Sequence, residues 1–95
     1  MTQEKRRIIR EATAGLDDKE DAQIRISPGE EGSGLVIEVH SKVESMFGDQ
    51  IRASALEVLE HYGLDDVKVY IVDRSALDYV IRARLRTAIE RVLRE

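Results

Sequence analysis

Few side chains in this sequence have the types and spacing that metal chemistry requires. The two histidines, His40 and His61, lie far apart in the chain, and there is no cysteine. No spacing pattern supplies a third ligand for either imidazole, as a zinc site needs. We interpret both histidines as ordinary surface residues, and the sequence predicts no metal site.

Two pairs of neighbouring carboxylates could act as an acid and a base. They are Asp17 with Asp18, and Asp65 with Asp66. A catalytic acid needs an apolar pocket that raises its pKa, but both pairs lie in short polar connections. We interpret them as solvated turns, and the sequence indicates no catalytic residue.

The glycine-rich segment 28–34 is a third candidate, because glycine loops can bind phosphate. It reads Pro-Gly-Glu-Glu-Gly-Ser-Gly. A P-loop also needs a lysine followed by serine or threonine, and it joins a strand to a helix. Both features are missing, and the segment lies between two alternating stretches, so we interpret it as a hairpin turn.

The composition limits the class of protein. The chain has 95 residues and 36% charged residues of both signs, with a net charge of −4. One domain over residues 1–95 is expected, and the acidic balance argues against nucleic-acid binding. No stretch approaches the ~20 apolar residues that span a bilayer, and the first residues lack a signal-peptide core. We therefore expect a cytoplasmic protein without a membrane partner.

Hydrophobic periodicity predicts an α-β-β-α-β-α order. The expected elements are a helix over 3–14, strands over 22–27 and 35–40, a helix over 41–62, a strand over 67–72 and a helix from about 75 to the end. These elements predict an α+β, two-layer sandwich, in which helices cover one face of a mixed three-stranded sheet. An apolar patch on the first helix could drive self-association.

The two longer helices carry apolar stripes that we expect to form the core. The stripes consist of Val43, Phe47, Ile51, Ala55, Val58 and Leu59 in one helix, and Leu77, Val80, Ile81, Leu85, Ala88, Ile89 and Val92 in the other. Ser41 with Glu44 and Ser75 with Asp78 have capping-box spacing. Gly63 is expected to end the middle helix in a left-handed conformation.

Several segments together resemble one protein family. They are Val-Glu-Ser-Met-Phe-Gly-Asp-Gln-Ile-Arg (43–52), Leu-Glu-Val-Leu-Glu-His-Tyr (56–62), Val-Asp-Arg-Ser-Ala-Leu-Asp (72–78), Ile-Arg-Ala-Arg-Leu (81–85) and Ile-Arg-Ile-Ser-Pro (24–28). The chain resembles the acyl-carrier (gamma) subunit of citrate lyase over about residues 22–90. The delta subunit of malonate decarboxylase is a more distant relative.

The resemblance implies a carrier subunit and not an enzyme. In that family a serine bears a phosphoribosyl-dephospho-coenzyme A arm, which presents an acyl thioester to the citrate lyase alpha and beta subunits. Tethering raises the effective concentration of the acyl group at each partner. Asp78, Arg82 and Arg84 belong to the family-like segments and could dock partners. A solvated helix face with an Asp78–Arg82 pair is an equally good interpretation.

The sequence departs from the family at the arm. Counting back from Pro28, the serine position falls at Lys19, and residues 16–21 contain no serine or threonine. A lysine amine cannot form the phosphodiester, so we expect no cofactor on this chain and an inactive carrier. Ser27, Ser33 and Ser41 do not match the family position either. The alternative is a redesigned or structural domain with no ligand and no partner.

Overall fold

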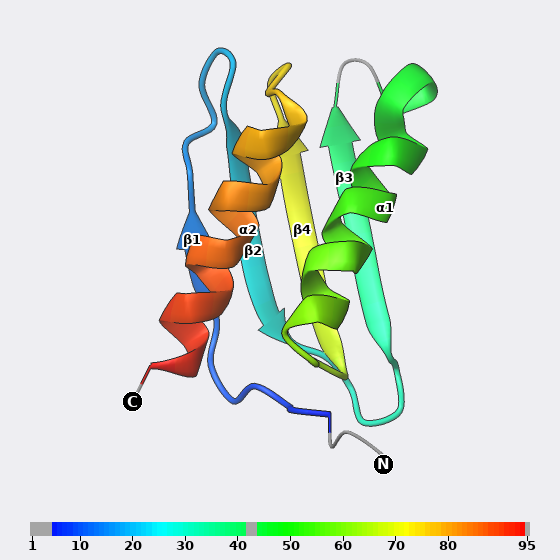
Figure 1. Cartoon of the computed structure of the whole chain (residues 1–95), viewed down its shortest axis with the longest axis vertical. Helices are drawn as coiled ribbons and strands as arrows, with labels where there is room; N and C mark the ends of the chain where they lie inside the picture. Colours follow the sequence, from blue (N-terminus) through cyan, green and yellow to red (C-terminus); the bar gives the residue numbers. More distant parts are fainter. Residues whose placement is uncertain (1–4, 42–43, 95) are drawn as a thin grey trace.

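A four-stranded sheet with two helices on one face forms the protein (Figure 1). The structure, a computed structural model, describes residues 5–41 and 44–94, without the side chains of 44–46. Its elements are β1 (Ala12–Ala14), β2 (Ala22–Pro28), β3 (Leu35–Ser41), α1 (Glu44–His61), β4 (Val67–Asp73) and α2 (Asp78–Leu93). The predicted α+β class and the helices on one face are confirmed.

The strand order is β1-β2-β4-β3, so β4 lies in the interior of the sheet. Val69 at its centre pairs with Ile26 of antiparallel β2 and with Ile37 of parallel β3. Side chains alternate along β2 and β4, and one set, which includes Ile24, Ile26, Val69 and Ile71, faces the helices and is buried. α2 packs over β1 and β2, and α1 packs over β3.

The predicted hairpin between β2 and β3 is wrong. β4 is hydrogen-bonded between the two strands, so they never pair. The alternating pattern identified both strands but carries no information on which neighbour each one takes. The segment 29–34 instead packs against the start of β4, where the Gly29 amide donates to the Asp66 carbonyl.

The predicted helix over 3–14 is also wrong for the residues that the structure describes. Residues 12–14 form β1, which adds a fourth strand to the predicted three. Arg6 pairs with the connection after α1, because its amide donates to the Gly63 carbonyl. The edge of β2 needs hydrogen-bond partners, and β1 supplies them. The helical patch that suggested self-association is therefore absent, although Ile9 is 85% exposed.

The helix ends agree with the sequence in part. Gly63 follows α1 with φ +66°, as expected for a left-handed cap. The second capping box is wrong, because Leu77 precedes α2 and no side chain caps it. Ser41 donates to Asp73, and the side chain of its predicted partner, Glu44, lies outside the described residues.

Candidate functional site

Three segments that are distant in the sequence meet at one end of the sheet. They are the β1–β2 loop (residues 15–21), the β4–α2 turn (residues 74–77) and the first turns of α1 (Figure 1). The family resemblance assigns the arm to the first of these segments. This end, which we call the loop end, is therefore the candidate site.

The β1–β2 loop is fixed to the β4–α2 turn by backbone hydrogen bonds. The Glu20 amide donates to the Arg74 carbonyl (2.8 Å), and the Arg74 amide donates to the Asp21 carbonyl (3.0 Å). The Arg74 guanidinium also donates to the Asp17 carboxylate, and this bond lowers the pKa of Asp17. The loop is thus anchored at two places by main chain and side chain together.

Asp21 joins both ends of the loop to α2. Its carboxylate accepts hydrogen bonds from the amides of Leu16 (3.2 Å) and Ala22 (2.7 Å). Arg84 of α2 donates to the same carboxylate, with Nε 2.9 Å from Oδ1. The Arg84 hydrogen bond is the largest cause that holds the pKa of Asp21 below its ordinary value.

Gly15 is required where the loop leaves β1. Its φ is +81°, and a Cβ atom at this position would lie 1.9 Å from the carbonyl oxygen of Ala22. Only glycine allows the two ends of the loop to approach so closely.

Lys19 lies exposed near the tip of this loop. Its backbone amide donates to the side chain of Asp18 (2.7 Å). Together with Ser75 and the neighbouring charged residues, it lines a shallow depression of about 390 Å³. The contacts that shape the loop come from Gly15, Asp17, Asp21 and Arg74, so they do not depend on the side chain at position 19. Ser75 and Lys19 are far apart in the sequence, so no local pattern could have predicted that they line the same depression.

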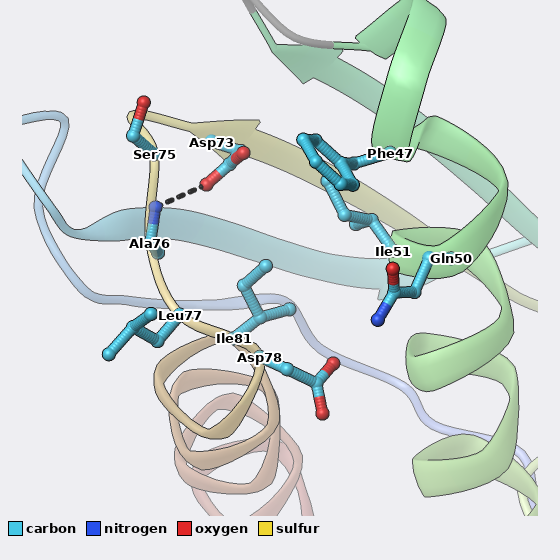
Figure 2. A pocket seen from close by; sticks show the side chains of 9 residues that line it. All are labelled: Phe47, Gln50, Ile51, Asp73, Ser75, Ala76, Leu77, Asp78 and Ile81. Carbon is cyan, nitrogen blue, oxygen red and sulfur yellow. Dashed lines mark hydrogen bonds between the residues drawn. The ribbon is translucent and has the colours of Figure 1, made fainter.

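An apolar groove of about 330 Å³ lies beside this depression, between the starts of α1 and α2 (Figure 2). Ile51 and Ile81 are buried in its floor. Phe47 and Leu77, on opposite sides of the groove, are 45% and 61% exposed. The prediction that these two residues belong to the core is therefore wrong.

The groove arises because the apolar stripe of each helix continues in the N-terminal direction beyond the residues that are buried in the core. Phe47 is one turn N-terminal to Ile51, and Leu77 is one turn N-terminal to Ile81. The central strand β4 ends at Asp73, before the chain reaches Leu77, and Phe47 and Leu77 remain exposed. Asp73 itself is buried and accepts a hydrogen bond from the Ala76 amide (2.9 Å; Figure 2).

Two of the predicted docking residues connect α2 to α1. Asp78 accepts hydrogen bonds from the Ser54 hydroxyl (2.5 Å) and from Arg82 Nε (2.7 Å). The Ser54 bond is the largest cause that lowers the pKa of Asp78. Arg82 also reaches Glu57 on α1 (3.2 Å). Asp78, Arg82 and Arg84 thus have intramolecular partners, and their role in docking stays a prediction.

The remaining candidate residues lie outside the three segments of the loop end, and the described ones form no group of potential metal ligands. Asp66, expected in a solvated turn, is only 4% exposed. It accepts a hydrogen bond from the Gly34 amide (2.9 Å) at the opposite end of the sheet. His40 and His61 are exposed, as expected. Within residues 5–41 and 44–94, no group of three potential ligands could hold a metal ion.

Comparisons with known proteins identify the family of the chain. The family described as "ACP: Malonate decarboxylase delta subunit (MdcD)" matches residues 9–92. The citrate lyase acyl carrier protein of Serratia proteamaculans (strain 568) is 46% identical over 85 residues, which are 90% of this chain and 82% of the relative. That of Yersinia enterocolitica is 44% identical, covering 90% of this chain and 87% of the relative.

A solved structure shares the fold. A chain in the crystal structure of a Pseudomonas malonate decarboxylase hetero-tetramer in complex with malonate aligns with a TM-score of 0.79 at 19% identity. The alignment covers 96% of this chain and 92% of that chain. None of these comparisons supports a redesigned origin. In the part of the chain that the structure describes, neither helix is long and apolar enough to cross a membrane.

Proposed function

Because the chain belongs to the acyl carrier family of citrate lyase and malonate decarboxylase, we propose that it is a carrier-type subunit of a citrate-lyase-type complex that bears no arm. Acyl carriers are carrier subunits and are not themselves catalysts, so the proposal assigns no reaction to this chain. Its partners would be the alpha and beta subunits of such a complex, in the cytoplasm.

The proposal that the chain bears no arm is supported by the residue types in the β1–β2 loop. Residues 16–21 are Leu-Asp-Asp-Lys-Glu-Asp, and none of them carries a hydroxyl group. The arm of the family is attached through a phosphodiester, which requires a hydroxyl oxygen on the protein. The residues at this position do not fit the group, because the amine of Lys19 cannot supply that oxygen.

Neighbouring hydroxyl groups do not replace the missing serine. Thr13 lies in β1, outside the loop. Ser75 lines the same depression as Lys19 but lies in the β4–α2 turn. A transferase that recognises the loop would meet Lys19 at its exposed tip.

The rest of the loop supports a carrier-type subunit. Gly15, Asp21 and Arg74 fix a compact loop whose tip is exposed. Such a loop presents the residue at position 19 to a partner, whatever its side chain. We therefore propose that the scaffold for presentation is retained and the attachment chemistry is lost.

Intact-mass spectrometry tests this proposal. The chain is incubated with the prosthetic-group transferase of citrate lyase and its nucleotide substrate, with the Serratia proteamaculans carrier as the positive control. We expect the control to gain the mass of the arm and this chain to remain unchanged. A mass gain that peptide mapping assigns to any hydroxyl of this chain would refute the proposal.

A further inference from the structure

The apolar groove between α1 and α2 has no covering element among the described residues, although its walls are the ends of two core stripes. Phe47 and Leu77 border it, and Ile51 and Ile81 form its floor. Four of the seven described large apolar side chains that are exposed lie in the loop end or in the adjoining first turn of α2, namely Leu16, Phe47, Leu77 and Tyr79. Small soluble proteins rarely leave apolar residues gathered in this way unless the surface binds something.

The charges around the groove indicate what kind of surface it fits. Among the described residues that line the groove and the adjoining depression, five are carboxylates and only two are cations. Arg74 is paired with Asp17, and Asp78 is paired with Arg82 of α2. Carboxylates still outnumber cations beside the apolar floor, and a complementary surface is apolar at its centre and basic at its rim.

We infer that this groove is the docking site for a catalytic subunit of the complex, which inserts an apolar side chain surrounded by lysine and arginine. The inference rests on the proposed function, which supplies the partner. The groove and Lys19 lie at the same end of the sheet, and Ser75 lines both the groove and the depression of Lys19. A partner bound in the groove would thus cover the segment that the family uses for its arm.

Two other occupants fit the geometry less well. A second copy of this chain would bring the same acidic rim against itself, which is unfavourable. A terminal segment of this chain is the other alternative, but the blue and red ends of the described chain lie at the opposite end of the sheet (Figure 1). The basic, apolar partner is the occupant that both the floor and the rim favour.

A binding measurement with a matched pair of variants tests the inference. The full chain is immobilised, and the purified catalytic subunits of the Serratia proteamaculans citrate lyase are the probe, because the carrier of that species is 46% identical. Leu77→Glu puts a charge at the edge of the groove, whereas Leu56→Glu changes another exposed leucine that does not line it. Circular dichroism and thermal melting establish that both variants fold.

We expect Leu77→Glu to weaken binding about tenfold or more, because it adds a negative charge where the partner is apolar, and Leu56→Glu to bind like the unchanged chain. The affinity should also fall as the salt concentration rises, because the rim is charged. Phe47→Glu, on the opposite wall, should reproduce the loss if Leu77→Glu proves unstable.

Several results would overturn the inference. They are equal binding by both leucine variants, binding that salt does not weaken, and no binding by the unchanged chain. A dimer that Leu77→Glu abolishes in sedimentation equilibrium would assign the groove to a second copy. Transfer of the arm to this chain would refute the proposed function alone, because the groove variants would still report on docking.

Discussion

Arg84 Nε lies 2.9 Å from Oδ1 of Asp21, across 63 positions of sequence. This ion pair joins the middle of α2 to the β1–β2 loop that contains Lys19. The Asp21 carboxylate also accepts hydrogen bonds from the amides of Leu16 and Ala22. One side chain therefore contacts both ends of the loop and α2. We infer that the shape of the loop is maintained from α2.

The Arg84–Asp21 pair predicts how the loop responds to a change in α2. Arg84→Gln removes the charge that faces Asp21, so the amides of Leu16 and Ala22 should exchange faster with deuterium while the core stays protected. Arg86→Gln, an exposed change on the same helix, is the control. Equal exchange in the two variants would contradict the account of Arg84.

The pair of glycines Gly15 and Gly32 predicts a difference in stability. Both have positive φ, but only Gly15 has an atom within 4 Å of an added Cβ. Backbone strain alone should cost about 1–2 kcal/mol in each alanine variant. Gly15→Ala should cost clearly more, because its Cβ meets the Ala22 carbonyl oxygen. Urea unfolding measures both, and equal losses would show that the close approach is unimportant.

The contacts of the Asp66 carboxylate predict how the stability of the fold depends on pH. Its hydrogen bond from the Gly34 amide is the largest cause that lowers its pKa below the ordinary 3.8. Arg7 Nε, 3.1 Å from the other oxygen, adds an opposite charge. The charged form therefore stabilises the fold above pH 3.8, and this contribution is lost as the pH falls through the lower, folded-state pKa.

Asp66→Asn should accordingly be less stable than the unchanged chain at pH 7, and the difference should shrink as the pH falls below 3.8. Thermal melts from pH 7 to pH 2 measure this. Asp65→Asn, a change at the neighbouring residue, is the control. A constant difference between Asp66→Asn and the unchanged chain at every pH would contradict the assignment.

The elements with strong periodicity could be predicted from sequence, and their neighbours could not. β2, β3, β4 and both helices lie close to the expected ranges because alternating or 3.6-residue patterns define each one locally. Whether β3 lies beside β2 or β4 depends on contacts across the sheet, which no local pattern records.

The first segment shows how a short apolar pattern misleads. Ile8 and Ala12 have helical spacing, but Ile8, Ala12 and Ala14 are also separated by even numbers of residues, as on one face of a strand. Pairing with β2 decides between the two conformations. β1 forms because the edge of β2 needs hydrogen-bond partners. The sequence alone does not show that edge.

The sequence predicts where the candidate site lies in the chain but not its shape. The resemblance led to Lys19 by counting from Pro28, and the structure adds the anchoring of that loop to Arg74. The groove was missed because Phe47 and Leu77 continue the stripes of α1 and α2 without interruption. Periodicity does not tell where the sheet beneath a helix ends.

The most direct test of the proposal that this chain is an unarmed carrier is to restore the hydroxyl. Lys19→Ser, Asp18→Ser and the unchanged chain are each incubated with the citrate lyase prosthetic-group transferase and its nucleotide substrate, and their intact masses are compared. The account predicts that only Lys19→Ser gains the mass of the arm, because the loop already has the required shape. A Lys19→Ser chain that stays unmodified beside a modified Serratia carrier, or an unchanged chain that gains the arm, would contradict it.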